Sequence, residues 1–164
     1  MVWNFLIIGG VVIIFIILAR RVPAAIGIKQ GKTEISPEKI TTIGLIAQAD
    51  EAFDRKDFAK AEELYIKAAS QEPSNAKIYN KLGAIYLEQS NFYDAKESFL
   101  QSIRLEPEVA SRHVNLGLAY LGLKDYFKAG QALQDALQLE PKNKKYLVLA
   151  EKVSKLEERE KRKR

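Results

Sequence analysis

Hydrophobic and polar positions follow three different patterns along the 164 residues of the chain. Residues 5–19 are apolar without interruption, which predicts a helix with no polar face. Residues 22–36 contain one proline, two glycines and no periodic apolar positions, which is typical of a linker. From residue 37 onward, apolar positions recur every three or four residues among charged ones, so this part is predicted to consist of amphipathic helices.

Residues 1–21 are predicted to form a transmembrane helix. With Val2 and Trp3 the apolar stretch reaches about 18 residues and would span roughly 27 Å, close to the hydrocarbon core of a thin bilayer. Arg20 and Arg21 flank the stretch on its C-terminal side. Because positive flanks stay in the cytoplasm, the N-terminus is predicted to lie outside and the rest of the chain in the cytosol.

Two other interpretations of this segment remain open. A cleaved signal peptide has an apolar core of similar length, but positive charge normally precedes that core, whereas here the arginines follow it. A helix buried within a protein normally keeps a polar face, which this stretch lacks. The short N-terminus and plain apolar stretch favour a retained anchor in a bacterial inner membrane, although mitochondrial import receptors share the layout.

The helical region repeats with a period of 34 residues. Pro73, Pro107 and Pro141 are spaced by this interval, and four further columns of positions share it. The columns are Ala49, Gly83 and Gly117; Ala61, Ala95 and Ala129; Tyr65, Phe99 and Leu133; and Ala68, Ser102 and Ala136. Such a period is typical of a solenoid, so we predict an all-α fold of three helix-turn-helix repeats. The repeats are residues 42–75, 76–109 and 110–143.

Packing explains these columns. A small residue in the middle of each first helix lets the second helix approach closely, and each proline prevents continuation of a second helix. Ser36, Pro37 and Glu38 predict a helix start, so the repeat domain is expected to span residues 37–143. Residues 144–164 are predicted to form a capping helix and basic tail. The apolar face of this helix is predicted to comprise Tyr146, Leu147, Ala150, Val153 and Leu156.

The intervals resemble those of the tetratricopeptide repeat, a 34-residue unit with Leu-Gly, Tyr, Ala, an aromatic residue, Ala and Pro at these places. The second and third repeats match most positions. The first departs at the Leu-Gly pair, where it has Gln48 and Ala49, and at the tyrosine, where it has Ala52. The resemblance covers residues 42–143 and implies an interaction domain whose first helices line a concave groove.

The resemblance also implies which residues line this groove. They are Ile46, Asp50 and Phe53 in the first repeat, Lys77, Asn80, Lys81, Ala84 and Leu87 in the second, and Val114, Asn115, Leu118 and Leu121 in the third. Asn80 and Asn115 are candidates for hydrogen bonds to a ligand backbone, and the apolar members are candidates for burial. Lys81 is expected to face solvent without a packing role. The alternative is that the polar members are merely solvated.

Some chaperone-binding members of the family grip a C-terminal carboxylate with a clamp of Lys, Asn and Arg side chains. The corresponding places here hold Ile46, Asp50, Lys81, Ser111 and Asn115. The clamp is therefore not expected, which argues against a chaperone tail as the ligand.

Composition removes most catalytic and metal chemistry. The chain has no cysteine, which excludes thiolate metal sites and cysteine nucleophiles. The only histidine, His113, occupies the column of Leu45 and Tyr79, so a structural role is predicted. The acidic residues between positions 50 and 57 lie on one helix and its turn, whereas a metal needs ligands from several elements. We predict neither an enzyme nor a metal or cofactor site.

Charge is distributed unevenly: residues 1–41 carry a formal charge of +3, residues 42–143 carry −3 and residues 144–164 carry +5. The preferred prediction is a membrane-anchored adaptor that binds a protein or peptide in its groove. The alternative is binding of the basic tail to anionic lipid, nucleic acid or a ribosome. No aromatic residue lies within the tail to stack a base, so nucleic acid is the less favoured partner.

Overall fold

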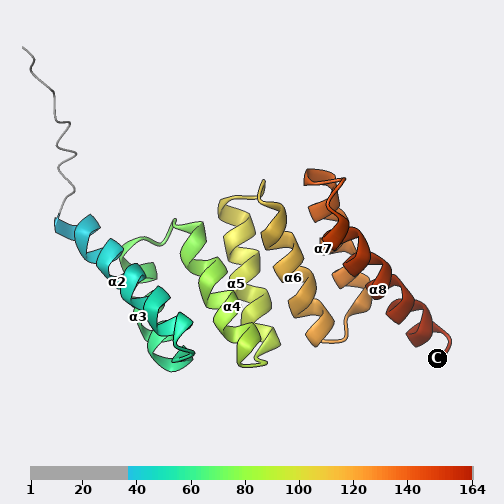
Figure 1. Cartoon of the computed structure of the whole chain (residues 1–164), viewed down its shortest axis with the longest axis horizontal. Helices are drawn as coiled ribbons and strands as arrows, with labels where there is room; N and C mark the ends of the chain where they lie inside the picture. The colour runs from blue at the N-terminus through green and yellow to red at the C-terminus, as the bar shows by residue number, and fades with distance from the viewer. Residues whose placement is uncertain (1–36, 164) are drawn as a thin grey trace, which may run out of the picture. The chain divides into compact units, whose positions relative to one another are not determined.

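The computed structural model describes residues 37–163, with side chains from residue 41 onward. Within this range the chain forms helices and no strands (Figure 1). The helices are α2 (Pro37–Asp54), α3 (Phe58–Gln71), α4 (Ala76–Glu88), α5 (Phe92–Leu105), α6 (Ala110–Gly122), α7 (Tyr126–Leu139) and α8 (Lys144–Lys161). The prediction of an all-α fold is confirmed.

The predicted transmembrane helix and linker, with Arg20 and Arg21, lie outside the described residues. Among the helices formed by residues 37–163, none is both long enough and apolar enough to span a bilayer.

Six helices pair as three successive hairpins, α2 with α3, α4 with α5 and α6 with α7 (Figure 1). Each hairpin lies against the next, because α3 contacts α4 and α5 contacts α6. The helix starts follow the repeat, since α4 begins at Ala76 and α6 begins at Ala110. The first of these helices, α2, begins at Pro37, where the sequence predicts a helix start. The predicted solenoid is therefore present.

The repeating columns form the core of this solenoid. Their buried members are Ala49, Gly83 and Gly117; Ala61, Ala95 and Ala129; Tyr65, Phe99 and Leu133; and Ala68, Ser102 and Ala136. A Cβ atom on Gly83 would lie only 2.6 Å from the ring of Phe99 on α5. A Cβ atom on Gly117 would lie 3.2 Å from Leu133 on α7. The small column is therefore required by close contact between the two helices of a hairpin.

The turns within the hairpins contain two further periodic positions that the columns above do not include. A residue with positive φ ends the first helix of each hairpin, and an Asp or Asn side chain then caps the second helix. The positive-φ residues are Lys56, Ser90 and Lys124, with φ between 58° and 61°. The capping residues are Asp57, Asn91 and Asp125. Asp or Asn at a fixed interval before a helical stretch is the signal that reveals these turns in the sequence.

Helix α8 packs on α7 in the way that a fourth first helix would. Its buried residue Val153 contacts the cluster formed by Ala129 and Leu133 of α7. The position in α8 that is equivalent to Ala49, Gly83 and Gly117 is occupied by Glu151, whose side chain is exposed and charged. A further second helix cannot pack closely over a charged glutamate, so the solenoid ends at this helix.

The packed face of α8 differs from the prediction: of the five predicted residues, Ala150 and Val153 belong to the core cluster with Ala129 and Leu133, and Tyr146, Leu147 and Leu156 do not. Leu147 is 47% exposed, whereas Leu149 packs against the same cluster as Val153, together with Ala150. Leu149 lies four residues before Val153 and therefore on the same face of the helix, whereas Leu147 lies six residues before Val153 and faces away from the contact. The core clusters that the described residues form draw their side chains from α2 to α8, and residues 36–164 form one compact unit.

Candidate functional site

Two side-chain contacts join the first helices of successive repeats. Lys81 of α4 reaches Asp50 of α2, with 2.6 Å between Nζ and Oδ1. Asn115 of α6 donates a hydrogen bond from Nδ2 to Oδ1 of Asn80 on α4, at 3.1 Å. The structure thus brings four of the predicted groove residues into one strip over α2, α4 and α6.

Asp50 is the acceptor at which three helices meet. It also accepts a hydrogen bond of 2.5 Å from the phenol of Tyr65 on α3. Desolvation acts against the charged carboxylate, but the hydrogen bonds from Lys81 and Tyr65 outweigh it and hold the pKa of Asp50 below its ordinary value. Burial and the bond to Asp50 raise the pKa of Tyr65, so the phenol keeps its proton. Asp50 is therefore ionised and Tyr65 is protonated at neutral pH.

Lys81 has a structural role, contrary to the expectation from sequence. Besides pairing with Asp50, its ammonium group lies 5.7 Å from the centroid of the Phe53 ring. The side chains of Lys81 and Asp50 are 43% and 41% exposed, so solvent screens their attraction and the pair stabilises the fold only modestly. Charge reversal at Lys81 would therefore break an interhelical contact in addition to changing the groove. Sequence spacing alone does not reveal this pairing.

The asparagine pair keeps hydrogen-bonding capacity for a ligand. A side-chain amide has two N–H donors and one carbonyl acceptor. The contact between Asn115 and Asn80 uses one donor of Asn115 and the acceptor of Asn80. Within residues 41–163 the amide nitrogen of Asn80 and the carbonyl oxygen of Asn115 have no other hydrogen bond. These two groups complement the C=O and N–H of a peptide backbone.

Apolar groove residues lie on the same helices and are half-buried. Leu87 packs against the second core cluster, while Val114 and Leu121 pack against the third. Leu118 is also half-buried and precedes Leu121 by one helical turn on α6. The surface that these side chains retain is available for burial by a ligand. Lys77 is exposed, and no ion-pair partner for it exists among residues 41–163.

Two other polar side chains are structural. Arg112 is buried and donates hydrogen bonds to the carbonyl oxygen of Glu106 at 2.8 Å and to the Glu106 carboxylate at 2.7 Å. Arg112 occupies the column of Ile78, and a cation in an otherwise apolar column is the sequence signal for such a buried pair. Nε2 of His113 lies 2.8 Å from the carbonyl oxygen of Pro107, as the predicted structural role requires.

Three of the four acidic residues between positions 50 and 57 have separate partners. Asp50 pairs with Lys81, Asp57 caps α3, and Glu51 pairs with Arg55 at 3.0 Å. Nowhere in the described part of the chain do three or more His, Cys, Asp or Glu side chains converge as a metal site would require.

Comparison with known proteins identifies the repeat. Two family models described as tetratricopeptide repeat match residues 46–95 and 110–143, which together make up just over half of the chain. The chain belongs to the tetratricopeptide repeat family. Domains of this family are protein–protein interaction modules. No curated protein gives a match to the sequence.

Solved tetratricopeptide repeat domains have the same fold. The Arabidopsis OM64 domain is 24% identical with a TM-score of 0.69, and the alignment covers 72% of this chain and 98% of that one. The N-terminal domain of stress-induced protein-1 from C. elegans is 25% identical with a TM-score of 0.65, covering 74% and 98%. The first such domain of Spaghetti (RPAP3), solved with the HSP90 peptide SRMEEVD, is 19% identical with a TM-score of 0.68, covering 71% and 92%.

Proposed function

We propose that this protein is an adaptor that binds an extended segment of a partner protein across α4 and α6. The observation that carries the proposal is the Asn80–Asn115 pair, which spans two repeats and keeps N–H donors and a carbonyl acceptor for a ligand backbone. Leu118, on the same helix as Asn115, would contribute burial of apolar surface. Lys77, Leu87 and Leu121 would complete the binding surface.

The proposed ligand is a peptide, but not a chaperone tail. Similar domains have been solved with HSP90 and HSP70 peptides, which supports a peptide as the class of ligand. The positions of the carboxylate clamp hold Ile46, Asp50 and Ser111 instead of the basic and amide side chains that the family resemblance leads one to expect. Asp50 would repel the terminal carboxylate of a ligand, and Lys81 is already paired with Asp50. An internal segment therefore suits this groove better than a C-terminus.

We further propose that residues 1–21 anchor the adaptor in a membrane, with Arg20 and Arg21 at the cytosolic surface. This part of the proposal rests on the uninterrupted apolar stretch and the position of the two arginines. The partner would thereby be concentrated at the membrane. A bacterial inner membrane remains the proposed location.

The test is crosslinking in native membranes, identification of partners by mass spectrometry, and repetition with a groove variant. The variant combines Asn80→Ala, Asn115→Ala and Leu118→Glu. It is expected to reduce capture of the principal partner at least about tenfold, because it removes both backbone contacts and the apolar surface. The full-length protein should carry that partner into the membrane fraction, and the protein without residues 1–21 should not.

A matched control is Ile66→Glu, which changes an apolar residue that is 50% exposed on α3, a second helix. This control should capture partners normally, and both variants should keep the helical signal and the melting temperature within a few degrees. If the groove variant retains every partner, the groove is not the working surface. If only deletion of residues 161–164 abolishes capture, the basic tail is the binding element instead.

A further inference from the structure

Helix α8 continues the groove wall beyond the third repeat. It packs on α7 as α6 packs on α5, so the groove-facing positions of α6 have equivalents 34 residues later. Val114 corresponds to Val148, Leu118 corresponds to Lys152 and Leu121 corresponds to Lys155. A shallow pocket of about 330 Å³ lies along α8. Its lining residues are Val148, Glu151, Lys152, Lys155, Leu156 and Arg159.

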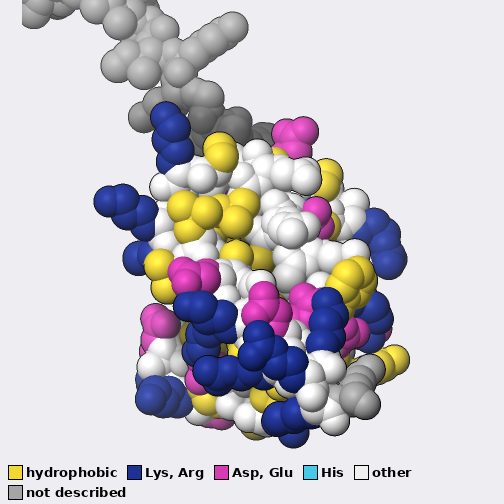
Figure 2. Space-filling model, turned by 90° about the vertical axis from the view of Figure 1, so that its right-hand side faces the viewer, with side chains coloured by type: hydrophobic (Ala, Val, Ile, Leu, Met, Phe, Trp, Pro, Cys, Tyr) yellow, Lys and Arg dark blue, Asp and Glu magenta, His cyan; other side chains and the backbone are white. Residues whose placement is uncertain are grey.

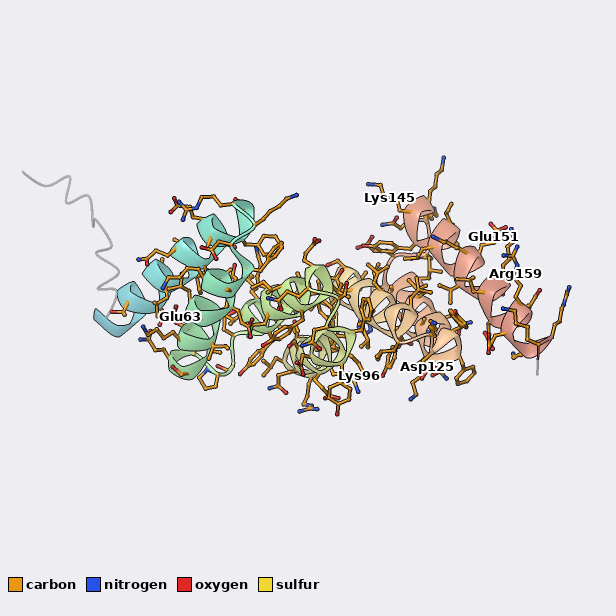
Figure 3. All side chains as sticks on the ribbon, turned by 90° about the horizontal axis from the view of Figure 1, so that it is seen from below. Glu63, Lys96, Asp125, Lys145, Glu151 and Arg159 are labelled. Carbon is orange, nitrogen blue, oxygen red and sulfur yellow. The ribbon has the colours of Figure 1, made fainter. Side chains whose placement is uncertain are left out.

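The chemistry of the wall changes at α8 from apolar to cationic. Lys145, Lys152 and Arg159 are spaced by seven residues, so they form one stripe along the helix, which we call the α8 stripe. Figure 2 shows Lys and Arg side chains gathered on the face at this end of the domain, and Figure 3 shows Lys145 and Arg159 towards opposite ends of α8. Successive members of the stripe are about 10.5 Å apart along the helix axis.

The cations of the α8 stripe share with Lys77 the lack of a counterion among residues 41–163, whereas other cations near the groove are paired. Lys81 is paired with Asp50, and Lys155 is paired with Glu151 at 2.6 Å. For the three stripe residues, the described residues provide no ion-pair partner, and all three side chains are exposed. Each of these cations is therefore available to pair with an anionic group of a ligand.

We propose that the α8 stripe binds an acidic stretch of the partner segment, whose neighbouring part lies across α4 and α6. This inference rests on the proposed peptide-binding function. A polyproline II segment advances about 9.3 Å every three residues and presents every third side chain on one face, which nearly matches the spacing of the stripe. The expected ligand therefore carries Asp or Glu at every third position. The exposed Val148 and half-buried Leu156 provide apolar contact between the cations.

A protein segment fits this site better than the other polyanions. Lys145 and Lys152 occupy the positions that Ser111 and Leu118 occupy on α6, so a chain that lies across α6 can continue onto the stripe. No aromatic side chain lines the pocket, so bases of a nucleic acid would find no stacking partner.

The test uses residues 36–164, which contain all three core clusters, and measures fluorescence anisotropy of labelled peptides of about twelve residues. One peptide has glutamate at every third position, and a second has the same composition with its glutamates in a block. The spaced peptide is expected to bind at least about threefold more tightly, with affinity that falls as salt rises. Charge reversal of the stripe, with Lys145→Glu, Lys152→Glu and Arg159→Glu, is expected to weaken its binding at least about tenfold.

The matched control reverses Lys161, Arg162 and Lys163 to Glu, which changes the net charge equally but beyond the stripe. This control should weaken binding of the spaced peptide less than about threefold. The neutral variant Lys145→Gln, Lys152→Gln and Arg159→Gln should also weaken binding of the spaced peptide, but less than charge reversal of the stripe does. Circular dichroism verifies that each variant is folded.

Three results would overturn the inference. The first is an equal loss of peptide affinity in the stripe and tail variants, and the second is equal affinity for the spaced and blocked peptides. The third is binding to phosphatidylserine vesicles or to a single-stranded oligonucleotide without binding to the spaced peptide. None of these results affects the proposed function, because the Asn80, Asn115 and Leu118 variant tests that function by partner capture. Loss of partner capture in that variant with no binding of the spaced peptide would reject the α8 stripe alone.

Discussion

At the scale of single residues, Gly83 determines how closely α4 and α5 pack. The ring of the buried Phe99 occupies the space in which a Cβ atom of residue 83 would lie. Gly130 of α7 is a contrasting case, because no atom lies within 4 Å of the place where its Cβ would be. Both glycines are within helices, where glycine is unfavourable relative to alanine by about 1 kcal/mol. Of these two glycines, only Gly83 is required by the packing of its neighbours.

The two Gly→Ala changes should therefore have opposite signs. Gly83→Ala is expected to lower the free energy of unfolding by about 1–2 kcal/mol, since overpacking outweighs the gain in helix propensity. Gly130→Ala is expected to raise it by about 0.5–1 kcal/mol. Urea unfolding followed by circular dichroism measures both. Stabilisation by Gly83→Ala would mean that Phe99 is free to move away, and the role given to the small column would be wrong.

At the scale of helices, side-chain hydrogen bonds act both between repeats and within a repeat. Tyr86 of α4 donates to Glu62 of α3 in the preceding repeat at 3.0 Å, whereas Ser102 of α5 donates to the carbonyl oxygen of Ala76 in its own repeat at 2.7 Å. Burial and the bond to Glu62 raise the pKa of Tyr86 to about 12. The folded state therefore binds the phenolic proton more tightly than the unfolded chain does.

This pKa shift predicts a loss of stability at alkaline pH. Because the pKa of Tyr86 is higher in the folded protein than in the unfolded chain, the protonated phenol stabilises the fold. This stabilisation is fully present below pH about 10, the pKa of the unfolded chain, and is lost as pH rises through about 12. Tyr86→Phe should therefore flatten the fall in unfolding free energy between these limits, as measured by urea unfolding at several pH values. The control Tyr93→Phe changes a tyrosine that is 60% exposed and should leave the slope as it is in the wild type. Identical slopes in all three proteins would show that the Tyr86–Glu62 bond is not maintained.

At the scale of the whole domain, stability depends on every apolar face being covered by a neighbour. Each repeat of a solenoid contacts only the next, so an uncovered terminal repeat exposes its core. Helix α8 provides the cover at the C-terminal end: Val153 is buried against Ala129 and Leu133, while Glu151 faces outward. The same helix carries the α8 stripe on its groove side. One helix thus ends the array and changes the charge of the groove.

Two valines of α8 test the covering role with matched substitutions. Val153→Asp places a charge in the buried contact with α7 and should cost about 3 kcal/mol or more, with a tendency of the protein to associate. Val148→Asp changes a side chain that is 66% exposed and should alter stability by no more than about 0.5 kcal/mol. Thermal unfolding and size-exclusion chromatography provide the measurements. Equal effects of the two changes would contradict the packing of α8 on α7.

The architecture of the described domain was predictable from sequence because a solenoid requires only local periodicity and contact between neighbours. The proline, glycine and alanine columns indicate where the helices of each pair end and where they pack closely. Because these columns share one 34-residue period, they predict all three helix pairs. The turn positions, such as Lys56 with Asp57, repeat at the same interval and were equally accessible. The assignment of residues 1–21 to a membrane rests on sequence alone.

The tertiary structure decided how side chains of different repeats meet. Lys81 with Asp50 and Asn115 with Asn80 lie 31 and 35 residues apart, so the distances between them depend on the angle at which successive first helices cross. Periodicity assigns a residue to a face of a helix, whereas the crossing angle between helices determines which atoms on two faces come within bonding distance.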